Sequence, residues 1–282
     1  MRHGFELQGH RGARGLFAEN TLEGFVATMA LGVSSLELDV GVTQDGVMVV
    51  HHDFALNPDI ARGPDGRFLA ESGAALPLIC QLRHADLTQY DVGRIRPTST
   101  TAASHPGQCG ADGVRIPALA DLLDAISGTG MTLDVELKTD PARPGHSVAP
   151  EDMARQLLDV ARSAVAEQRL VVRSFDWRGL LWLQEQAPQV PLVWLSQGIA
   201  DPAGMIVASD GRGTWAPDWN HLSEAGVATV HAAGLRVIPW TVNRADVMRR
   251  LIAWGVDGIC TDRPDIARAV MAQCGLALPQ SC

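Results

Sequence analysis

The segment "FELQGHRGARGLFAENTLEGFVATMALGVSSLELDVGV", residues 5–42, decides the fold class. A short apolar run at 5–9 is followed by a helical pattern at 21–32 and by a second apolar run at 35–42. The helical pattern ends at Gly32, as helices often do. A strand, a helix and a second strand in this order form one βαβ unit, in which the two strands run parallel. The segment therefore predicts a fold of the α/β class.

The same alternation of apolar runs and helical patterns continues along the chain. If the run at 47–51 is a hairpin partner of the run before it, eight strands and about seven helices remain, which suits a (β/α)8 TIM barrel. Strands are predicted near 5–9, 35–42, 47–51, 131–137, 169–175, 191–195, 213–216, 235–241 and 257–261, and helices near 21–32, 117–128, 150–168, 177–187, 201–208, 218–234 and 244–255.

At 282 residues with 46% hydrophobic content, the chain can bury one large core, and we expect a single barrel domain over residues 1–282.

One region interrupts the alternation of strands and helices. Residues 54–116 contain many Pro, Gly, Ser and Thr residues and show little periodicity. Because they follow the strand that carries His51 and His52, barrel geometry places them over the C-terminal mouth, where barrel active sites lie. We expect a small insertion after the second strand that covers a site.

The charge and the termini restrict the partners. A formal net charge of −9 argues against binding nucleic acid or an anionic membrane surface. No run of eighteen apolar residues is present, so no stable membrane insertion is expected. The start "MRHGFELQGH" lacks a signal-peptide pattern, which favours a cytoplasmic location. A periplasmic or secreted location stays open if a signal peptide has been removed.

The five cysteines leave at least one thiol unpaired, and none forms a CxxC or a metal-ligand spacing. Reduced thiols are expected. A bridge between Cys80 and Cys109, or between Cys274 and Cys282, remains an alternative for an exported protein.

Two carboxylates interrupt the apolar run "SSLELDVGV" at 34–42. Side chains alternate along a strand, so Glu37 and Asp39 share one face. Two such carboxylates repel each other and lose hydration, so a positive charge should lie between them. A solvated edge strand is one explanation; a hard divalent cation with oxygen ligands is the other.

The strand "MTLDVELKT" at 131–139 repeats this arrangement, with Asp134, Glu136 and Lys138 on one face. A Glu–Lys pair alone indicates only a salt bridge. Together with the carboxylates of the second strand, it favours one shared Mg²⁺ or Ca²⁺. Asp134 lies deeper and is expected to be a hydrogen-bonded core carboxylate. The predicted metal ligands are Glu37, Asp39 and Glu136.

The charges around this cluster indicate a small anionic ligand. Three carboxylates are opposed by a divalent cation together with Arg11 and Lys138, which leaves one positive charge. That charge matches a phosphodiester monoanion, which Arg11 would bind in a bidentate manner and Lys138 as a point charge.

Two histidines complete the predicted site. His10 ends the first strand, and His52 ends "GVMVVHHD" at 46–53, so both are expected at the barrel mouth. A lone histidine is usually structural, but two beside a metal suit general acid–base catalysis. His51 points to the opposite face. The histidines without comparable context are His3, His84, His105, His146, His221 and His231.

The motifs "GHRGA", "AENTLEGF", "ELDVGVTQDGVMVVHHD", "VELK", "SFD", "WTVN" and "GVDGICTDRPD" resemble, in content and order, those of the glycerophosphodiester phosphodiesterase family. The resemblance extends from residue 9 to 265 and implies a (β/α)8 barrel with a small insertion after the second strand. It also implies hydrolysis of glycerophosphodiesters to an alcohol and glycerol 3-phosphate with a divalent cation. By position it implies acid–base roles for His10 and His52, metal binding by Glu37, Asp39 and Glu136, and phosphate binding by Arg11 and Lys138.

The chain departs from the family pattern at two places. Ala18 replaces the usual Pro before Glu-Asn-Thr, and "FALNPDIAR" at 54–62 replaces a Leu-x-Arg pattern, which leaves substrate choice open. Glu19 and Asn20 are expected to cap the helix near Thr21 and to brace the His10 loop.

Two aromatic residues end later strands. Trp240 lies in "VIPWTVN" and Phe175 ends "RLVVRSF", so the barrel would deliver both rings to the mouth. A plug in the barrel top is the structural explanation for Trp240. We expect instead that Trp240 and Phe175 pack on the carbon atoms of a bound glycerol.

Two rival functions remain. A relative of sphingomyelinase D would use a similar barrel, two histidines and Mg²⁺ on choline lipids; "WTVN" and "TDRPD" favour the glycerophosphodiester reading instead. A non-catalytic metal-binding barrel is the second rival, and the filled catalytic positions weigh against it. The oligomeric state is not predicted.

Overall fold

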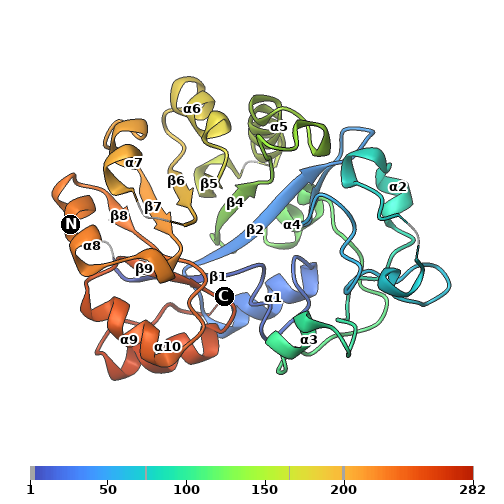
Figure 1. The fold of residues 1–282 in the computed structure, drawn as a ribbon, viewed down its shortest axis with the longest axis horizontal. Coiled ribbons are helices and arrows are strands. Elements are labelled where there is room, and N and C mark those ends of the chain that lie inside the picture. Colours follow the sequence, from blue (N-terminus) through green and yellow to red (C-terminus); the bar gives the residue numbers. More distant parts are fainter. Residues whose placement is uncertain (1–3, 74, 165, 199–200, 282) are drawn as a thin grey trace.

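The protein is a (β/α)8 barrel in a computed structural model that describes residues 4–73, 75–164, 166–198 and 201–281. Its parallel strands follow the order β8-β7-β6-β5-β4-β2-β1-β9, and β3 pairs with β2 (Figure 1). The predicted fold class is confirmed. The strands are β1 (Glu6–Gly9), β2 (Ser35–Val42), β3 (Met48–Val50), β4 (Thr132–Leu137), β5 (Leu170–Ser174), β6 (Leu192–Ser196), β7 (Thr214–Pro217), β8 (Arg236–Val237) and β9 (Gly258–Thr261).

The barrel closes between β8 and β9. Cys260 N–H donates to the carbonyl of Pro239 at 3.0 Å, and Val242 N–H donates to that of Cys260 at 2.9 Å. The predicted strand 235–241 is nevertheless wrong in length, because regular pairing with β7 stops at Val237. A cis peptide bond joins Trp240 to Thr241 further along this segment.

Pairing around β2 brings the acidic residues together. β3 is antiparallel to β2, as expected for a hairpin partner, whereas β4 is parallel to it. The register of β2 and β4 places Glu37 beside Asp134 and Asp39 beside Glu136. Because side chains alternate along each strand, all four carboxylates lie on the same face of the two strands.

Helices surround the barrel and bury its outer face (Figure 1). α10 was not predicted, because its buried face is short and depends on Ala267, Val270 and Met271. The helices that follow the barrel strands are α1 (Leu22–Leu31), α4 (Leu119–Ala125), α5 (Pro150–Ser163), α6 (Trp177–Gln186), α7 (Pro202–Ala208), α8 (Glu224–Ala232), α9 (Ala245–Ala253) and α10 (Pro264–Gln273).

The segment between β3 and α4 folds beside the barrel, at the right of Figure 1. It contains α2 (His84–Leu87), α3 (Thr100–Ser104) and two short 3₁₀ turns, and it is ordered around an apolar cluster of its own. Its two ends meet, since Val50 N–H donates to the carbonyl of Pro117 at 2.9 Å and Val49 bridges to Ala118. The cluster consists of Val49, Leu56, Ile60, Ala61, Ile79, Leu87, Val92, Val114 and Ile116.

The structure bears on the expected cysteine pairing and on the expected absence of a membrane span. Cys80, Cys109, Cys260 and Cys274 are free thiols, so a Cys80–Cys109 bridge is wrong, and Cys282 lies outside the described residues. Among the residues that are described, no helix combines the length and the apolar character that crossing a bilayer requires.

Candidate active site

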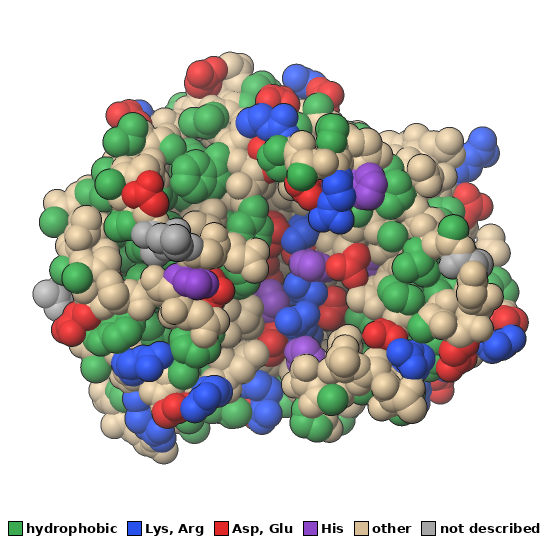
Figure 2. Space-filling view, in the orientation of Figure 1, with side chains coloured by type: hydrophobic (Ala, Val, Ile, Leu, Met, Phe, Trp, Pro, Cys, Tyr) green, Lys and Arg blue, Asp and Glu red, His purple; other side chains and the backbone are tan. Residues whose placement is uncertain are grey.

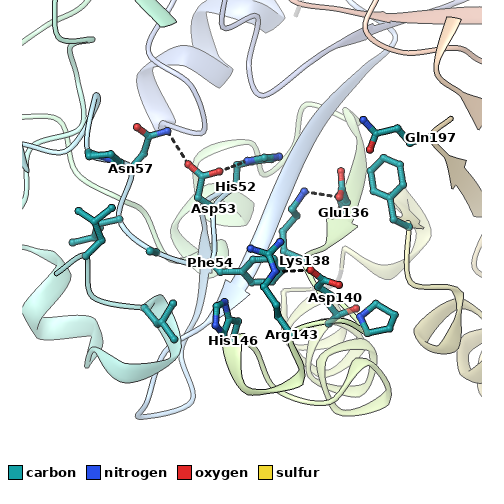
Figure 3. Close-up of a pocket in the computed structure, with 18 of the residues that line it drawn as sticks. His52, Asp53, Phe54, Asn57, Glu136, Lys138, Asp140, Arg143, His146 and Gln197 are labelled. Carbon is teal, nitrogen blue, oxygen red and sulfur yellow. Dashed lines mark hydrogen bonds and ion pairs between the residues drawn. The ribbon is translucent and has the colours of Figure 1, made fainter. Parts of the chain in front are cut away.

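Two adjoining cavities open between the barrel and the insertion, and charged side chains and histidines gather in this hollow (Figure 2). The inner cavity is about 110 Å³ and is lined by His10, Arg11, Glu37 and Arg173, among others. The outer cavity is about 710 Å³, and Figure 3 shows residues that line it. Four residues border both cavities: His52, Glu136, Phe175 and Trp240.

The structure brings the three predicted metal ligands together. Glu37, Asp39 and Glu136 are buried, and each offers one oxygen that lies within 4.8 Å of the others. Asp39 Oδ1 is buried and has no hydrogen-bond partner among the described residues. Three hard oxygen donors at this separation suit a divalent cation. The donor set therefore fits the group that the sequence predicts.

The surroundings shift the pKa values of Glu37 and Asp39 in opposite directions. Burial and the neighbouring Asp39 raise the pKa of Glu37 to about 8. Burial also acts against ionisation of Asp39, but the positive charges of His52, Arg11 and Lys138 outweigh it and hold its pKa well below the usual value. Like-charge crowding at Glu37 is the kind of strain that a bound cation relieves.

Arg11 and Lys138 lie against these carboxylates. Arg11 Nε is 3.3 Å from Asp39 Oδ2, and its Nη1 donates to Glu19 at 3.1 Å. Lys138 Nζ donates to Glu136 at 2.6 Å and is 3.6 Å from Asp39 Oδ1. Both cations thus border the acidic cluster, as expected for groups that receive a phosphate there.

Arg173 is a cation that sequence reasoning missed. It is fully buried on β5, pairs with Asp134 and lies 3.7 Å from Glu37. Asp134 also accepts from Gln8 at 2.8 Å, which agrees with its predicted place in the core. An arginine in the apolar stretch "RLVVRSF" gives no signal of its partners, which come from four other strands.

The predicted charge balance is wrong as a result. It omitted Glu19, Asp134, Asp262, Arg14 and Arg173, all of which form ion pairs in this network. With them, six carboxylates face four permanently cationic side chains, and a divalent cation brings the set to neutrality. The carboxylates are Glu19, Glu37, Asp39, Asp134, Glu136 and Asp262, and the cations are Arg11, Arg14, Lys138 and Arg173.

His10 is buried and lines the inner cavity. Its Nδ1 is 2.5 Å from Asp262 Oδ1, and its Nε2 is 3.9 Å from Glu37 Oε2. Burial lowers the pKa of His10 to about 4, although Asp262 acts to raise it. The imidazole is therefore neutral near pH 7, the state that can accept a proton.

His52 lines both cavities, whereas His10 lines only the inner one (Figure 3 shows His52). Its Nδ1 is 2.7 Å from Asp53 Oδ1, and Asp53 also accepts from Asn57 at 2.7 Å. His51 turns away, and its Nε2 lies 3.2 Å from the carbonyl of Ala55. The predicted difference between His51 and His52 matches this geometry.

Phe175 and Trp240 form one wall of both cavities. Their rings meet edge to face, with centroids 5.2 Å apart and an interplanar angle of 83°. The Trp240 indole donates to the carbonyl of Ala216 at 2.9 Å, which fixes the ring. Phe175 is 40% exposed, so an apolar surface faces the opening.

The expectation that Glu19 and Asn20 cap the helix near Thr21 is wrong. Thr21, not Asn20 or Glu19, caps α1, because its hydroxyl accepts from Gly24 N–H at 3.1 Å. Asn20 instead donates to Asp39 at 2.9 Å, and Glu19 pairs with Arg11, so both residues do brace the site.

His105 was set aside on the sequence, yet its Nε2 lies 3.4 Å from Asp262 Oδ2. Only the folding of the insertion back onto the barrel brings them together. Sequence reasoning also missed Asn243 in "WTVN" and Asp262 in "TDRPD". Neither motif indicates which side chains these two residues contact in the folded protein.

Comparison with known proteins identifies the family. Residues 10–266 match the model of the "Glycerophosphoryl diester phosphodiesterase family". The chain belongs to this family. It is therefore assigned to an enzyme class, the phosphodiester hydrolases, as the sequence motifs imply.

Relatives of this family resemble the chain over most of its length. A glycerophosphodiester phosphodiesterase of Caldanaerobacter subterraneus is 26% identical over 91% of this chain and 93% of its own. A solved putative glycerophosphoryl diester phosphodiesterase of Silicibacter pomeroyi is 35% identical, with a TM-score of 0.91 over 98% of this chain and 96% of its own. An Oleispira antarctica phosphodiesterase, solved in complex with the product sn-glycerol-3-phosphate, shares the fold at 21% identity, with a TM-score of 0.75 over 95% of this chain and 97% of its own.

Proposed function

We propose that the protein hydrolyses glycerophosphodiesters to an alcohol and glycerol 3-phosphate, with a divalent cation and two histidines. The observation that carries this proposal is the buried triad of Glu37, Asp39 and Glu136, two members of which line the inner cavity together with His10 and His52. The product named for the Oleispira antarctica neighbour supports the substrate class.

Mg²⁺ or Ca²⁺ would be held by the three carboxylates of the triad. When bound, the ion supplies a positive charge that stabilises charge on phosphate oxygens in the transition state. Arg11 and Lys138 border the same cavities and add two further cations for the phosphate. Both side chains now pair with carboxylates of the site. A bound phosphate would compete with those carboxylates for the same two cations.

The two histidines would divide the proton transfers. His10, neutral and buried next to the inner cavity, accepts the proton of the attacking hydroxyl. His52 borders the outer cavity as well, where the departing alcohol has room, and donates a proton to its oxygen. The P–O bond to the alcohol breaks as the new P–O bond forms. His10 then releases its proton to water and His52 takes one up, so both histidines return to their starting states before the next turnover.

The two cavities suit the two halves of such a substrate. The inner cavity, at about 110 Å³, has room for a phosphoryl group, and the outer cavity, at about 710 Å³, is large enough for varied alcohols. Trp240 and Phe175 lie where the two meet and offer apolar ring surface to the glycerol carbons.

Phosphorus NMR of a head-group panel tests this function. We expect release of glycerol 3-phosphate from glycerophosphocholine, glycerophosphoethanolamine and glycerophosphoglycerol when Mg²⁺ or Ca²⁺ is present. A persistent cyclic phosphate would indicate that a substrate hydroxyl, not water, attacks phosphorus. Failure to cleave any diester in the panel with either ion would overturn the proposal.

A further inference from the structure

Asp262 has an unusually complete set of hydrogen-bond donors. It follows β9 in the segment "TDRPD", and its side chain is 2% exposed. Oδ1 lies 2.5 Å from His10 Nδ1 and accepts from Arg14 Nε at 2.9 Å. Oδ2 accepts from Asn243 Nδ2 at 2.6 Å and lies 3.4 Å from His105 Nε2. Both oxygens are therefore occupied by donors.

This arrangement decides the tautomer of His10. A carboxylate whose two oxygens each face cationic or amide donors has no room for a proton of its own and acts only as an acceptor. Burial opposes its ionisation, but His10, His105 and Arg14 hold the pKa of Asp262 well below the usual value. The hydrogen between Asp262 and His10 must then belong to Nδ1. The other ring nitrogen, Nε2, keeps its lone pair and faces the acidic cluster.

Asp262 is itself held in place by the loop after β8. Asn243 Oδ1 accepts from the backbone N–H of Asp262 at 2.9 Å and from the Thr261 hydroxyl at 3.1 Å. The same asparagine thus binds both the backbone and the carboxylate of Asp262. Because the backbone and the carboxylate of Asp262 are both held, Asp262 can orient the His10 imidazole before substrate binds. Little conformational entropy is then lost on binding.

We propose that Asp262 is a positioning residue that keeps His10 in the Nδ1–H tautomer with Nε2 aimed at the reacting phosphate. The proposal rests on the function proposed above. Asp262 touches His10 and not the inner cavity, so it acts through the imidazole. The insertion takes part through His105, which reaches the same carboxylate from α3 and the turn after it.

Asp262→Asn is the sharpest test, because it preserves the shape of the side chain and replaces one of its two acceptor oxygens with an amide donor. Its amide nitrogen would face Nδ1 as a donor and would favour the Nε2–H tautomer, which cannot accept a proton. We expect kcat for a glycerophosphodiester to fall by roughly 10²- to 10⁴-fold, the usual contribution of general acid–base catalysis; the upper end is about the loss seen when the same change is made to a histidine-orienting aspartate. KM and the affinity for Mg²⁺ should stay within about 3-fold, because neither substrate nor metal touches this residue.

Asp265→Asn is the matched control. Asp265 lies three residues further along, pairs with Arg263 on the surface and has no contact with His10 among the described residues. It should retain wild-type kcat. An Asp262→Asn enzyme with wild-type kcat, or one that loses kcat only in proportion to lost metal, would overturn the positioning role.

A second readout does not depend on activity, and its wild-type measurement does not depend on whether Asp262→Asn folds. Long-range proton–nitrogen NMR of ¹⁵N-histidine protein with Mg²⁺ reports the tautomer of His10, whose signals are assigned by their loss in His10→Gln. We expect the Nδ1–H form in wild type and the Nε2–H form in Asp262→Asn. An Nε2–H form in wild type overturns the inference. An Nδ1–H form in a protein that cleaves no diester supports the inference and refutes the proposed function.

Discussion

At the scale of single residues, the site consists of charges that are costly to bury apart and stable together. Glu37 and Asp39 repel each other inside an apolar strand. The cations around them come from the loop after β1, from the residue that follows β4, and from β5. The sequence predicted the triad and both histidines because strand alternation places such side chains on one face. It did not predict Arg173 or Asp262, because their partners are set by tertiary contacts alone.

The first prediction concerns the two histidines. His10→Ala and His52→Ala should each lower kcat by roughly 10²- to 10⁴-fold, the usual contribution of general acid–base catalysis. The double variant should lose far less than the product of the two effects, because they serve one proton-transfer cycle. Steady-state kinetics on glycerophosphocholine gives these values. His51→Ala is the control and should be much milder; equal losses at His51 and His52 would contradict the assignment.

The second prediction concerns Trp240. Trp240→Ala should fold with its metal bound but lose about 10-fold or more in kcat/KM for glycerophosphodiesters, because it removes ring surface from the wall shared by both cavities. A small activated aryl diester without glycerol should lose much less. The ratio of kcat/KM for the two substrates is the measurement. A uniform loss on both would assign Trp240 to the core.

At the scale of elements, strand pairing and the insertion determine how the site is assembled. Strand positions were predicted well, because buried parallel strands read as short apolar runs. The end of β8 was not predicted, because it depends on where pairing with β7 stops. Helix α10 was not predicted either, because its apolar face is short. The 54–116 region offered little periodicity, yet it forms a cluster around scattered residues such as Leu56, Leu87 and Ile116.

The third prediction concerns this separate cluster. Leu87 is fully buried within it, so Leu87→Ala should cost about 2–5 kcal/mol of packing locally. Because the barrel has its own core, the expected result is faster proteolysis inside 54–116 and lower kcat/KM, with little change in the unfolding midpoint of the barrel. Limited proteolysis with mass spectrometry, beside a denaturant titration, measures both.

Leu122→Ala is the matched control for the third prediction. Leu122 is equally buried but belongs to the barrel core, so this change should lower the unfolding midpoint and leave 54–116 resistant to protease. If Leu87→Ala and Leu122→Ala shift the global midpoint alike, the insertion and the barrel form one cooperative unit.

At the scale of the whole molecule, strands β2 and β4 both contribute to one acidic centre, and its occupancy should affect the stability of the barrel. The register of β2 and β4 holds Asp39 beside Glu136, so the ligands exist together only in the folded protein. A ligand that binds only the folded state stabilises it by an amount that rises with its concentration.

The fourth prediction follows from this linkage. Chelation should abolish activity and lower Tm, and Mg²⁺ or Ca²⁺ at 100 times Kd should restore about 2.7 kcal/mol of stability. Asp39→Asn should remove the Tm response, whereas Asp152→Asn on the surface of α5 should keep it. Differential scanning fluorimetry against metal concentration gives the result; full activity in a verified metal-free enzyme would refute the ligand assignment.

The meeting of the two ends of the insertion at Val50 and Pro117 has a consequence for how such enzymes diversify. A segment that leaves and re-enters a barrel at neighbouring points can be replaced as one unit. Its length can change at small entropic cost, because the free-energy cost of closing a loop grows only with the logarithm of the loop length. Donor segments from other barrels of this type could be exchanged between these two points. The outer cavity would then be rebuilt for a different alcohol, while the barrel strands kept the acidic centre and its register unchanged.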